Sequence, residues 1–373
     1  MLCLAMLWCS ATLAGGAAGL CRPLQLAGSP ATWRSRLPLR LGMSDAKPID
    51  GEASDGVIGL RSPLRWIGPY PALALCFPEL STMAQVARGE KGVTLDFVLD
   101  TAANTNTINA QVAEQLSLPR VGEAAGGVGA GGSIGGGATY LLGDCELGDL
   151  PKEGRFTLMS GLTASALPVA APAAAGLLSI YFLASFPGGF EFRWGPTEAE
   201  PAWLTVFGDS QGTEAVVAGL NAAEVVQLPQ SGLPTVTLTV NGVDMPALLD
   251  TGSPITVLNA AAGAATGLTP HGGVGNPLAR LAAGVARSGS RGEYLTIAGA
   301  TGQPVRLTKT AACEVSIAGA DFGRSTCRVY VGELPGLAAL DGLGDRAGPA
   351  AVLGTDVLRQ RPRLVYKDSV IFM

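Results

Sequence analysis

The chain has 373 residues, of which 47% are hydrophobic and 15% charged, and its formal net charge is −5. This composition indicates a globular protein with room for two domains, and the absence of Lys/Arg clusters argues against nucleic-acid binding. A single histidine, His271, argues against a His-based zinc site and against Ser-His-Asp or Cys-His catalysis. The 52 glycines and 25 prolines favour a turn-rich β protein.

Residues 1–44 have the composition of a targeting leader. The first acidic residue is Asp45, and an apolar run at 2–20 is followed by several arginines among Ser, Pro and Leu. The uncharged start resembles a plastid transit peptide, and a secretory signal is the alternative. Residues 45–60 are polar and Gly-rich, which is typical of a linker.

The rest of the chain consists of two halves, 61–200 and 201–373, with the same order of features. Each half has an apolar strand that ends in Asp-Thr and then a helical segment, at 110–118 and at 260–268. A Gly-rich stretch and a strand with a Cys-Glu pair follow in each half. Each half then has a small-apolar run and a closing strand. A Pro/Glu-rich break at 196–201 separates the halves.

Two further patterns indicate β structure. The segment 234–240 alternates Thr and Val and turns at Asn241-Gly242, which predicts a hairpin. Residues 158–190 carry no charged side chain, which could suggest a membrane span, but prolines and glycines interrupt them, and we interpret them as buried β core. The four cysteines after the leader have no CxxC spacing and are too few for a disulfide framework, so we interpret most of them as buried small residues. They are Cys76, Cys145, Cys313 and Cys327.

The turn at Asp250 lies between two apolar segments, in the run Leu248-Leu249-Asp250-Thr251-Gly252-Ser253. A buried carboxylate costs free energy unless hydrogen bonds or a partner stabilise it. The first half has the related run Leu99-Asp100-Thr101-Ala102-Ala103. Two such turns in one chain predict that Asp100 and Asp250 face each other.

These paired turns, the glycine-rich run 129–137 and the closing motif 352–358 resemble the aspartic protease superfamily. The likeness is greater to retropepsin-like than to pepsin-like members, and it extends to plant or algal aspartyl proteases of plastids with two fused lobes. It implies a mainly β, bilobal acid-protease fold with two homologous retropepsin-like β-barrel lobes and a cleft between them.

The resemblance implies an aspartic endopeptidase that acts on peptides or proteins, as a monomer, without cofactor, metal or a membrane anchor in the mature chain. The catalytic residues would be Asp100 and Asp250. Thr101 and Thr251 would hold the loops together, supported by Gly252 and by Ser253, which would hydrogen-bond near its Asp. The glycine-rich run would form a flap over the substrate, and a flexible loop is the alternative. The flap residues would be Gly132, Ser133, Ile134, Gly135, Gly136 and Tyr140.

The first motif departs from the family pattern, because Ala102 stands where the family has Gly. An added methyl group could crowd the approach of the two loops. The alternative function is therefore a weakly active or inactive protease-like module that binds peptides or acts as a scaffold.

Overall fold

The computed structural model describes residues 59–129, 132–150, 155–167, 173–195, 201–268, 294–298, 304–317, 325–340 and 348–373. The predictions for the leader and for His271 lie outside the described residues.

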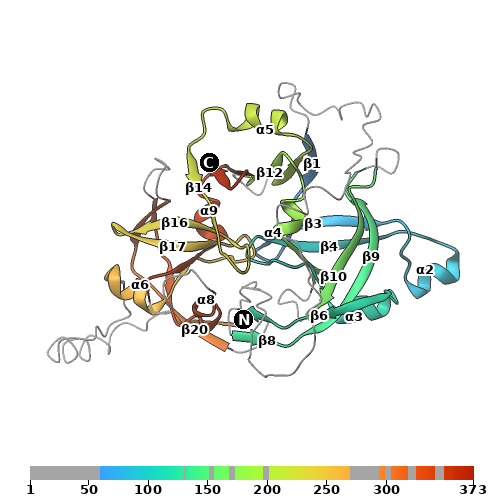
Figure 1. The fold of residues 1–373 in the computed structure, drawn as a ribbon, viewed down its shortest axis with the longest axis horizontal. Helices are drawn as coiled ribbons and strands as arrows, with labels where there is room; N and C mark the ends of the chain where they lie inside the picture. The colour runs from blue at the N-terminus through green and yellow to red at the C-terminus, as the bar shows by residue number, and fades with distance from the viewer. Residues whose placement is uncertain are drawn as a thin grey trace, which may run out of the picture.

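The described chain is mainly β, with three large sheets and one small hairpin (Figure 1). The eight-stranded sheet contains, in spatial order, β2 (Arg65–Ile67), β3 (Tyr70–Phe77), β4 (Val93–Asp100), β11 (Gly176–Ser179), β5 (Thr107–Ile108), β10 (Met159–Ala166), β9 (Gly137–Leu147) and β6 (Arg120–Ala124). The ten-stranded sheet contains β19 (Tyr294–Ala298), β20 (Pro304–Lys309), β23 (Tyr330–Val331), β18 (Val257–Leu258), β24 (Ala351–Leu353), β17 (Val243–Leu249), β16 (Pro234–Val240), β21 (Cys313–Ile317) and β22 (Ser325–Cys327), with β15 (Val226–Gln227) beside β16. The six-stranded sheet contains β1 (Gly59–Pro63), β13 (Trp203–Phe207), β12 (Gly189–Arg193), β25 (Arg363–Lys367), β26 (Val370–Phe372) and β14 (Ala222–Glu224). The small hairpin is β7 (Gly127–Gly129) with β8 (Gly132–Ile134).

Short helices connect these strands. They are α2 (Met83–Arg88), α3 (Ala110–Gln115), α4 (Ile180–Leu183), α5 (Ser210–Val217), α6 (Ala260–Ala265), α8 (Pro335–Ala338) and α9 (Thr355–Leu358).

The two halves share one strand arrangement. In the first half, β4 pairs in parallel with β11, which pairs antiparallel with β5, and β5 pairs in parallel with β10. In the second half, β17, β24, β18 and β23 repeat these pairings in the same order and directions. The repeat read from the sequence is therefore a repeat of topology, and the predicted mainly β, two-lobed fold is confirmed.

The predicted hairpin in the second half is confirmed as β16 and β17. Its turn residues Asn241 and Gly242 have φ values of 48° and 80°. Positive φ at both central positions suits the right-handed twist of the strands. Side chains of β16 alternate between the core and a more exposed face beyond Val236.

The helices after the two Asp-Thr turns are shorter than the sequence predicts. Asn109 and Asn259 cap their first turns, because each side chain accepts a hydrogen bond from a backbone N–H of the helix. Helix α3 ends before Ser117 and α6 before Gly267, where φ is 50° and 71°. A residue with left-handed φ ends a helix, so α3 and α6 end before Leu118 and Leu268, the residues at which the predicted segments end.

The six-stranded sheet joins the halves, because β12 pairs with β25 across them. In this sheet the buried Glu191 accepts a hydrogen bond from Arg363 Nε at 2.8 Å. Phe190 stacks on Tyr366 with ring centroids 5.1 Å apart. A buried ion pair and a pair of stacked rings thus connect strands of the two halves.

The uncharged stretch predicted as β core contains β10, β11 and α4, with Leu162, Leu177 and Phe182 buried. Among the residues that the structure describes, no helix is both long and apolar enough to cross a membrane.

Cys76, Cys145 and Cys313 are buried, as predicted, whereas Cys327 is half-buried, and all four are free thiols.

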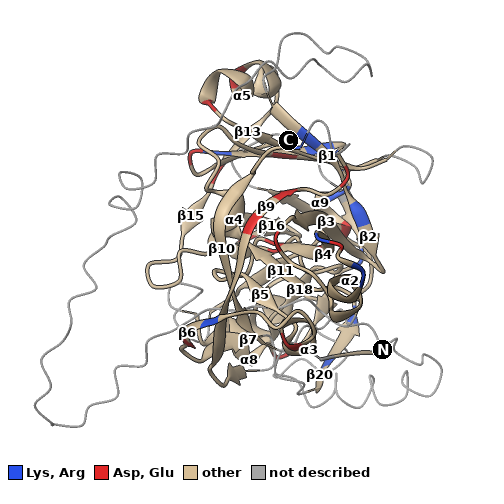
Figure 2. Cartoon of the chain, turned by 90° about the vertical axis from the view of Figure 1, so that its right-hand side faces the viewer, with Lys and Arg blue, Asp and Glu red and all other residues tan. Residues whose placement is uncertain are grey.

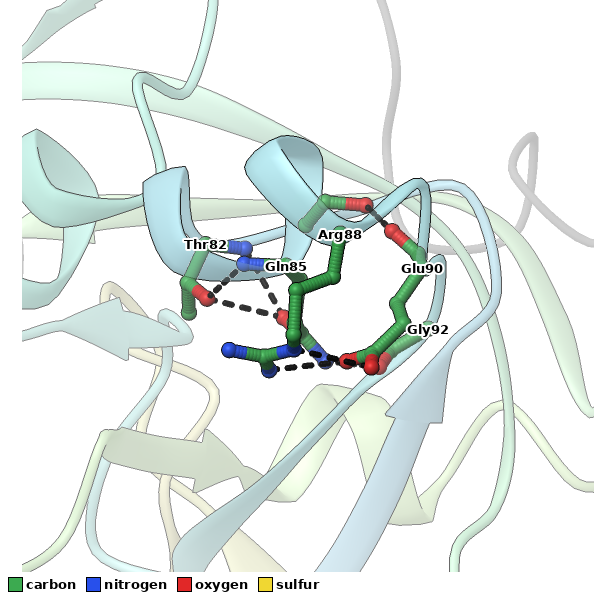
Figure 3. A network of polar contacts seen from close by, with 6 residues as sticks. Thr82, Gln85, Arg88, Glu90 and Gly92 are labelled. Carbon is green, nitrogen blue, oxygen red and sulfur yellow. Dashed lines mark hydrogen bonds and ion pairs between the residues drawn. The ribbon is translucent and has the colours of Figure 1, made fainter.

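The connection from β3 to β4 is held by a polar network around α2 (Figure 3). The Thr82 hydroxyl accepts from Gln85 N–H, and the Gln85 side chain accepts from Thr82 N–H, which is a capping box. Gln85 also donates to the Gly92 carbonyl, and Arg88 pairs with Glu90.

Basic residues are scattered over several elements, including β1, β2, β6 and β20 (Figure 2).

Candidate functional site

The two Asp-Thr turns occupy equivalent ends of equivalent strands. Strand β4 ends at Asp100, and β17 ends at Leu249, one residue before Asp250. The turns close alike, since Ala103 N–H donates to the Asp100 carbonyl and Ser253 N–H to the Asp250 carbonyl, at 3.2 and 3.3 Å. Both aspartates have 0% exposure.

Four hydrogen bonds link the two turns, and each of them involves the hydroxyl group of Thr101 or Thr251. The Thr101 hydroxyl donates to the Leu249 carbonyl at 2.6 Å, and the Thr251 hydroxyl donates to the Leu99 carbonyl at 2.8 Å. Each hydroxyl also accepts from the backbone N–H of the other threonine, at 3.0 and 3.2 Å. Each threonine thus satisfies one buried donor and one buried acceptor of the opposite half.

Glycine at position 252 allows the second turn to approach Asp100. A Cβ placed on Gly252 would lie 2.6 Å from Asp100 Cγ and within 2.9 Å of both carboxyl oxygens. Such contacts are shorter than van der Waals separation, so any larger residue would push the turn and the carboxyl apart. Ala102, the equivalent residue of the first turn, has a fully buried methyl group.

The two carboxyl groups differ in their surroundings. Asp100 Oδ1 accepts a hydrogen bond from Ala102 N–H at 2.9 Å, which stabilises negative charge on that oxygen. No hydrogen bond of standard geometry reaches either oxygen of Asp250 from the described residues, although the backbone N–H groups of Gly252 and Ser253 lie close enough to oppose the rise of its pKa. The asymmetry favours charge on Asp100.

Burial raises the pKa of Asp250 well above the usual carboxyl range, and the charge of Asp100 raises it further. The N–H groups of Gly252 and Ser253 oppose this shift, while a hydrogen bond between the two carboxyl groups adds to it. Two carboxylates cannot hydrogen-bond to each other unless one is protonated. The pair therefore favours a state that shares one proton.

Ser253 differs from the expectation that its hydroxyl bonds near Asp250. The hydroxyl donates to the Ile255 carbonyl at 2.7 Å, and its own carbonyl accepts from Thr355 N–H at 2.8 Å. The side chain therefore shapes the segment after the turn, and the backbone N–H is the part of Ser253 that acts on Asp250.

Sequence reasoning did not assign a role to Thr256 or Asp356. The half-buried Asp356 accepts hydrogen bonds from Thr256 N–H at 2.9 Å and from the Thr256 hydroxyl at 2.6 Å. Thr256 Oγ1 in turn accepts from Gly354 N–H at 3.0 Å. This bridge joins the segment after Asp250 to α9. The signal that could have revealed this bridge is the one acidic residue, Asp356, inside the closing motif 352–358.

The predicted flap is a long β-hairpin. Strand β6 pairs with β9, and the same two arms continue into β7 and β8. Strand β8 lies against α8 of the second half (Figure 1). A Cβ on Gly136 would lie 2.4 Å from the Ala124 carbonyl oxygen, and one on Gly126 would lie 2.7 Å from that of Ile134. These glycines therefore allow the two arms to approach closely.

The six predicted flap residues fall in two places. Gly132, Ser133 and Ile134 form β8, and Ile134 is buried whereas Ser133 is exposed. Gly135 and Gly136 are exposed between β8 and β9, and Tyr140 lies half-buried in β9, opposite Arg120. The described residues contain no cluster of three or more His, Cys, Asp or Glu side chains that could hold a metal ion.

Comparison with known proteins gives one family match, and no curated protein matches the chain. The aspartyl protease family model matches residues 236–356. Among solved structures, the EIAV protease complexed with the inhibitor HBY-793 is 21% identical, covers 34% of this chain and 86% of its own, and has a TM-score of 0.19. Basic 7S globulin from soybean is 11% identical, covers 82% of this chain and 96% of its own, and has a TM-score of 0.38.

The family match includes Asp250 and strand β24 and lies within the second half. The first half has the same strand pairings and its own buried Asp-Thr turn. The second half is therefore similar to the aspartyl protease family over residues 236–356, and the first half repeats its strand pairings.

Proposed function

We propose that the chain is an aspartic endopeptidase in which Asp100 and Asp250 activate a water molecule that attacks the peptide bond. The observation that carries this proposal is the buried carboxyl pair held by the reciprocal threonine bonds. A pair that shares one proton has a base and an acid side by side, which peptide hydrolysis by water requires.

The asymmetry of the pair supports one assignment of roles. Asp100, which accepts the Ala102 N–H, would be the ionised member and take a proton from the water. Asp250, whose pKa burial raises, would hold the shared proton and donate it to the carbonyl oxygen of the peptide. When the C–N bond then breaks, Asp100 gives its proton to the leaving amine nitrogen and Asp250 takes a proton from a hydroxyl group of the tetrahedral intermediate, so the pair again holds one proton.

Access to the pair requires movement, because both aspartates are fully buried. The hairpin of β7 and β8 extends from the first half to α8 of the second. We propose that this hairpin is the flap, and that it opens to admit a peptide and closes to exclude bulk water.

The test replaces each carboxyl group without changing its shape. Asp100→Asn and Asp250→Asn should each lower cleavage of a peptide library at least about 100-fold between about pH 4 and pH 7, because acid–base catalysis contributes about 10² to 10⁴-fold. Asp244→Asn is the matched control on strand β17, where the side chain is exposed and its Oδ1 accepts from Thr239. Unchanged cleavage by both active-site variants would reject the proposal.

A second candidate is a peptide-binding or scaffold module without turnover, and the methyl group of Ala102 is the observation that favours it. A statine-type transition-state mimic distinguishes the two, because a catalytic site binds it more tightly than it binds a substrate peptide. Inhibition of measurable cleavage supports the enzyme. Tight peptide binding without cleavage supports the module.

We further propose that the protein acts as a monomer in plastids, with the secretory pathway as the alternative. The composition of residues 1–44 supports the location, and the two lobes in one chain support the monomer. Fusion of residues 1–60 to a fluorescent protein tests the location, and light scattering of the purified chain tests the oligomeric state.

A further inference from the structure

Cys313 and Cys327 lie directly opposite each other on neighbouring strands. Strands β21 and β22 are antiparallel, and these two residues are register partners. Side chains of directly opposed residues project from the same face of a sheet. Their Cα atoms are typically about 4.5 to 5.5 Å apart, which lies within the roughly 4.4 to 6.8 Å that a disulfide spans. A disulfide would therefore need little movement of the backbone.

The two thiols already contact each other. Cys313 Sγ lies 3.4 Å from the Cys327 carbonyl oxygen, and the side chains hydrogen-bond to each other. That bond lowers the pKa of the Cys313 thiol to about 7, although burial opposes the change. The same bond and burial raise the pKa of Cys327. The lowered pKa of Cys313 favours a thiolate beside the Cys327 thiol, and this arrangement favours oxidation to a disulfide.

The other described cysteines lack this arrangement. Cys76 is opposite Thr94 on one neighbouring strand and Glu146 on the other. Burial raises the pKa of Cys145 to about 12, which keeps it a thiol. The feature is therefore specific to the pair on β21 and β22 among the described cysteines.

We propose that Cys313 and Cys327 are a redox-active pair that forms a reversible cross-strand disulfide with hydrogen peroxide as the oxidant. The Cys313 thiolate attacks one peroxide oxygen, which yields a sulfenic acid and hydroxide. The Cys327 sulfur then attacks the sulfenic sulfur, and the hydroxyl group leaves as water with the thiol proton. Overall, two thiols and one peroxide give one disulfide and two waters.

The pair lies beside α9. The Cys327 side chain hydrogen-bonds to Gln360, and Gln360 Nε2 donates to the Asp356 carbonyl at 3.2 Å. Asp356 is the residue that holds Thr256. The chemistry of the pair requires neither Asp100 nor Asp250, so it stands or falls independently of the proposed protease activity.

Peptide mapping of the full chain tests the proposal. Trypsin cleavage after Lys309, Arg324 and Arg328 would place Cys313 in peptide 310–324 and Cys327 in peptide 325–328. After peroxide treatment, alkylation and digestion without reductant, we expect these peptides as one cross-linked species, lighter than their sum by two hydrogen atoms. A dithiol should restore both free peptides. Recovery of both as alkylated thiols, or pairing of either with another cysteine, would overturn the proposal.

Variants supply the second readout. In Cys327→Ser, the sulfenic acid on Cys313 cannot be resolved, so a dimedone-type probe should label peptide 310–324. Cys313→Ala should abolish both the cross-link and the labelling, and Cys76→Ala should retain the cross-link. Absence of the label in Cys327→Ser, with the cross-link present in the unmodified chain, would refute the assignment of Cys313 as the attacking sulfur.

Discussion

The backbone N–H of Thr101 donates to the hydroxyl of Thr251, and the N–H of Thr251 donates to the hydroxyl of Thr101, at 3.2 and 3.0 Å. Because the two residues are 150 positions apart, these bonds connect the two halves directly behind the carboxyl pair. The separation of Asp100 and Asp250 thus depends on them.

Thr101→Val should destabilise the protein and reduce turnover. It leaves the Leu249 carbonyl and the Thr251 N–H buried without the partner they have now. Each unsatisfied group costs about 1 to 3 kcal/mol. Thr101→Ser keeps the hydroxyl and is the control. Thermal unfolding and peptide cleavage measure the effect, and equal values for the Val and Ser variants would show that the hydroxyl is unimportant.

The two turns should respond oppositely to one methyl group. Gly252→Ala places Cβ 2.6 Å from Asp100 Cγ, so we expect kcat/KM to fall roughly 10- to 100-fold, as small misplacements of reacting groups do. Ala102→Gly keeps the N–H that bonds to Asp100 and should retain or increase activity. Steady-state kinetics on one peptide measures both. Full activity of Gly252→Ala would contradict the geometry described above.

The stability of the protein should fall with rising pH because of Asp250. Its pKa in the folded state is raised above the ordinary value of 3.8, so the folded protein keeps a proton that the unfolded chain loses. This contribution is fully present below 3.8 and is lost as the pH rises through the folded pKa. Asp250→Asn removes the ionisation. The variant should therefore gain thermal stability over the unmodified protein as the pH rises from about 4 to about 7. A constant difference across that range would refute the prediction.

Two adjacent glycines test the flap. A Cβ on Gly136 would lie 2.4 Å from the Ala124 carbonyl oxygen, whereas one on Gly135 would meet nothing within 4 Å. Gly136→Ala should therefore distort the hairpin and lower kcat/KM, whereas Gly135→Ala should leave both unchanged. Hydrogen exchange of residues 120–140 and peptide cleavage provide the readouts. The same effect from both variants would point to flexibility of the run rather than to close packing of the arms.

Much of the second half was predictable because its signals are local. Alternating Thr and Val with Asn241-Gly242 predicts β16 and β17, since the turn residues accept positive φ without help from the rest of the fold. Asn259 likewise marks the start of α6. The ends of α3 and α6 were less predictable, because a left-handed residue such as Ser117 is set by the path of the chain into the next segment.

Details of the site depended on contacts that no local pattern encodes. The Ser253 hydroxyl turns to Ile255, and Asp356 reaches Thr256 across 100 positions. Both contacts form because buried polar groups need hydrogen-bond partners, and the assembled strands decide which partners are within reach. The pairing of Cys313 with Cys327 is of the same kind, because strand register alone brings the two thiols together.

By itself, the sequence determined that two buried Asp-Thr turns occur in two repeated halves, because apolar strands, turn residues and helix caps are local and the repeat is visible by inspection. Only the tertiary structure decided that the turns meet, that Gly252 packs against the Asp100 carboxyl, and that the two carboxyls have unequal surroundings. The physical reason is that burial, hydrogen-bond partners and the distance between charges are set by residues from both halves, which the folded chain alone brings together.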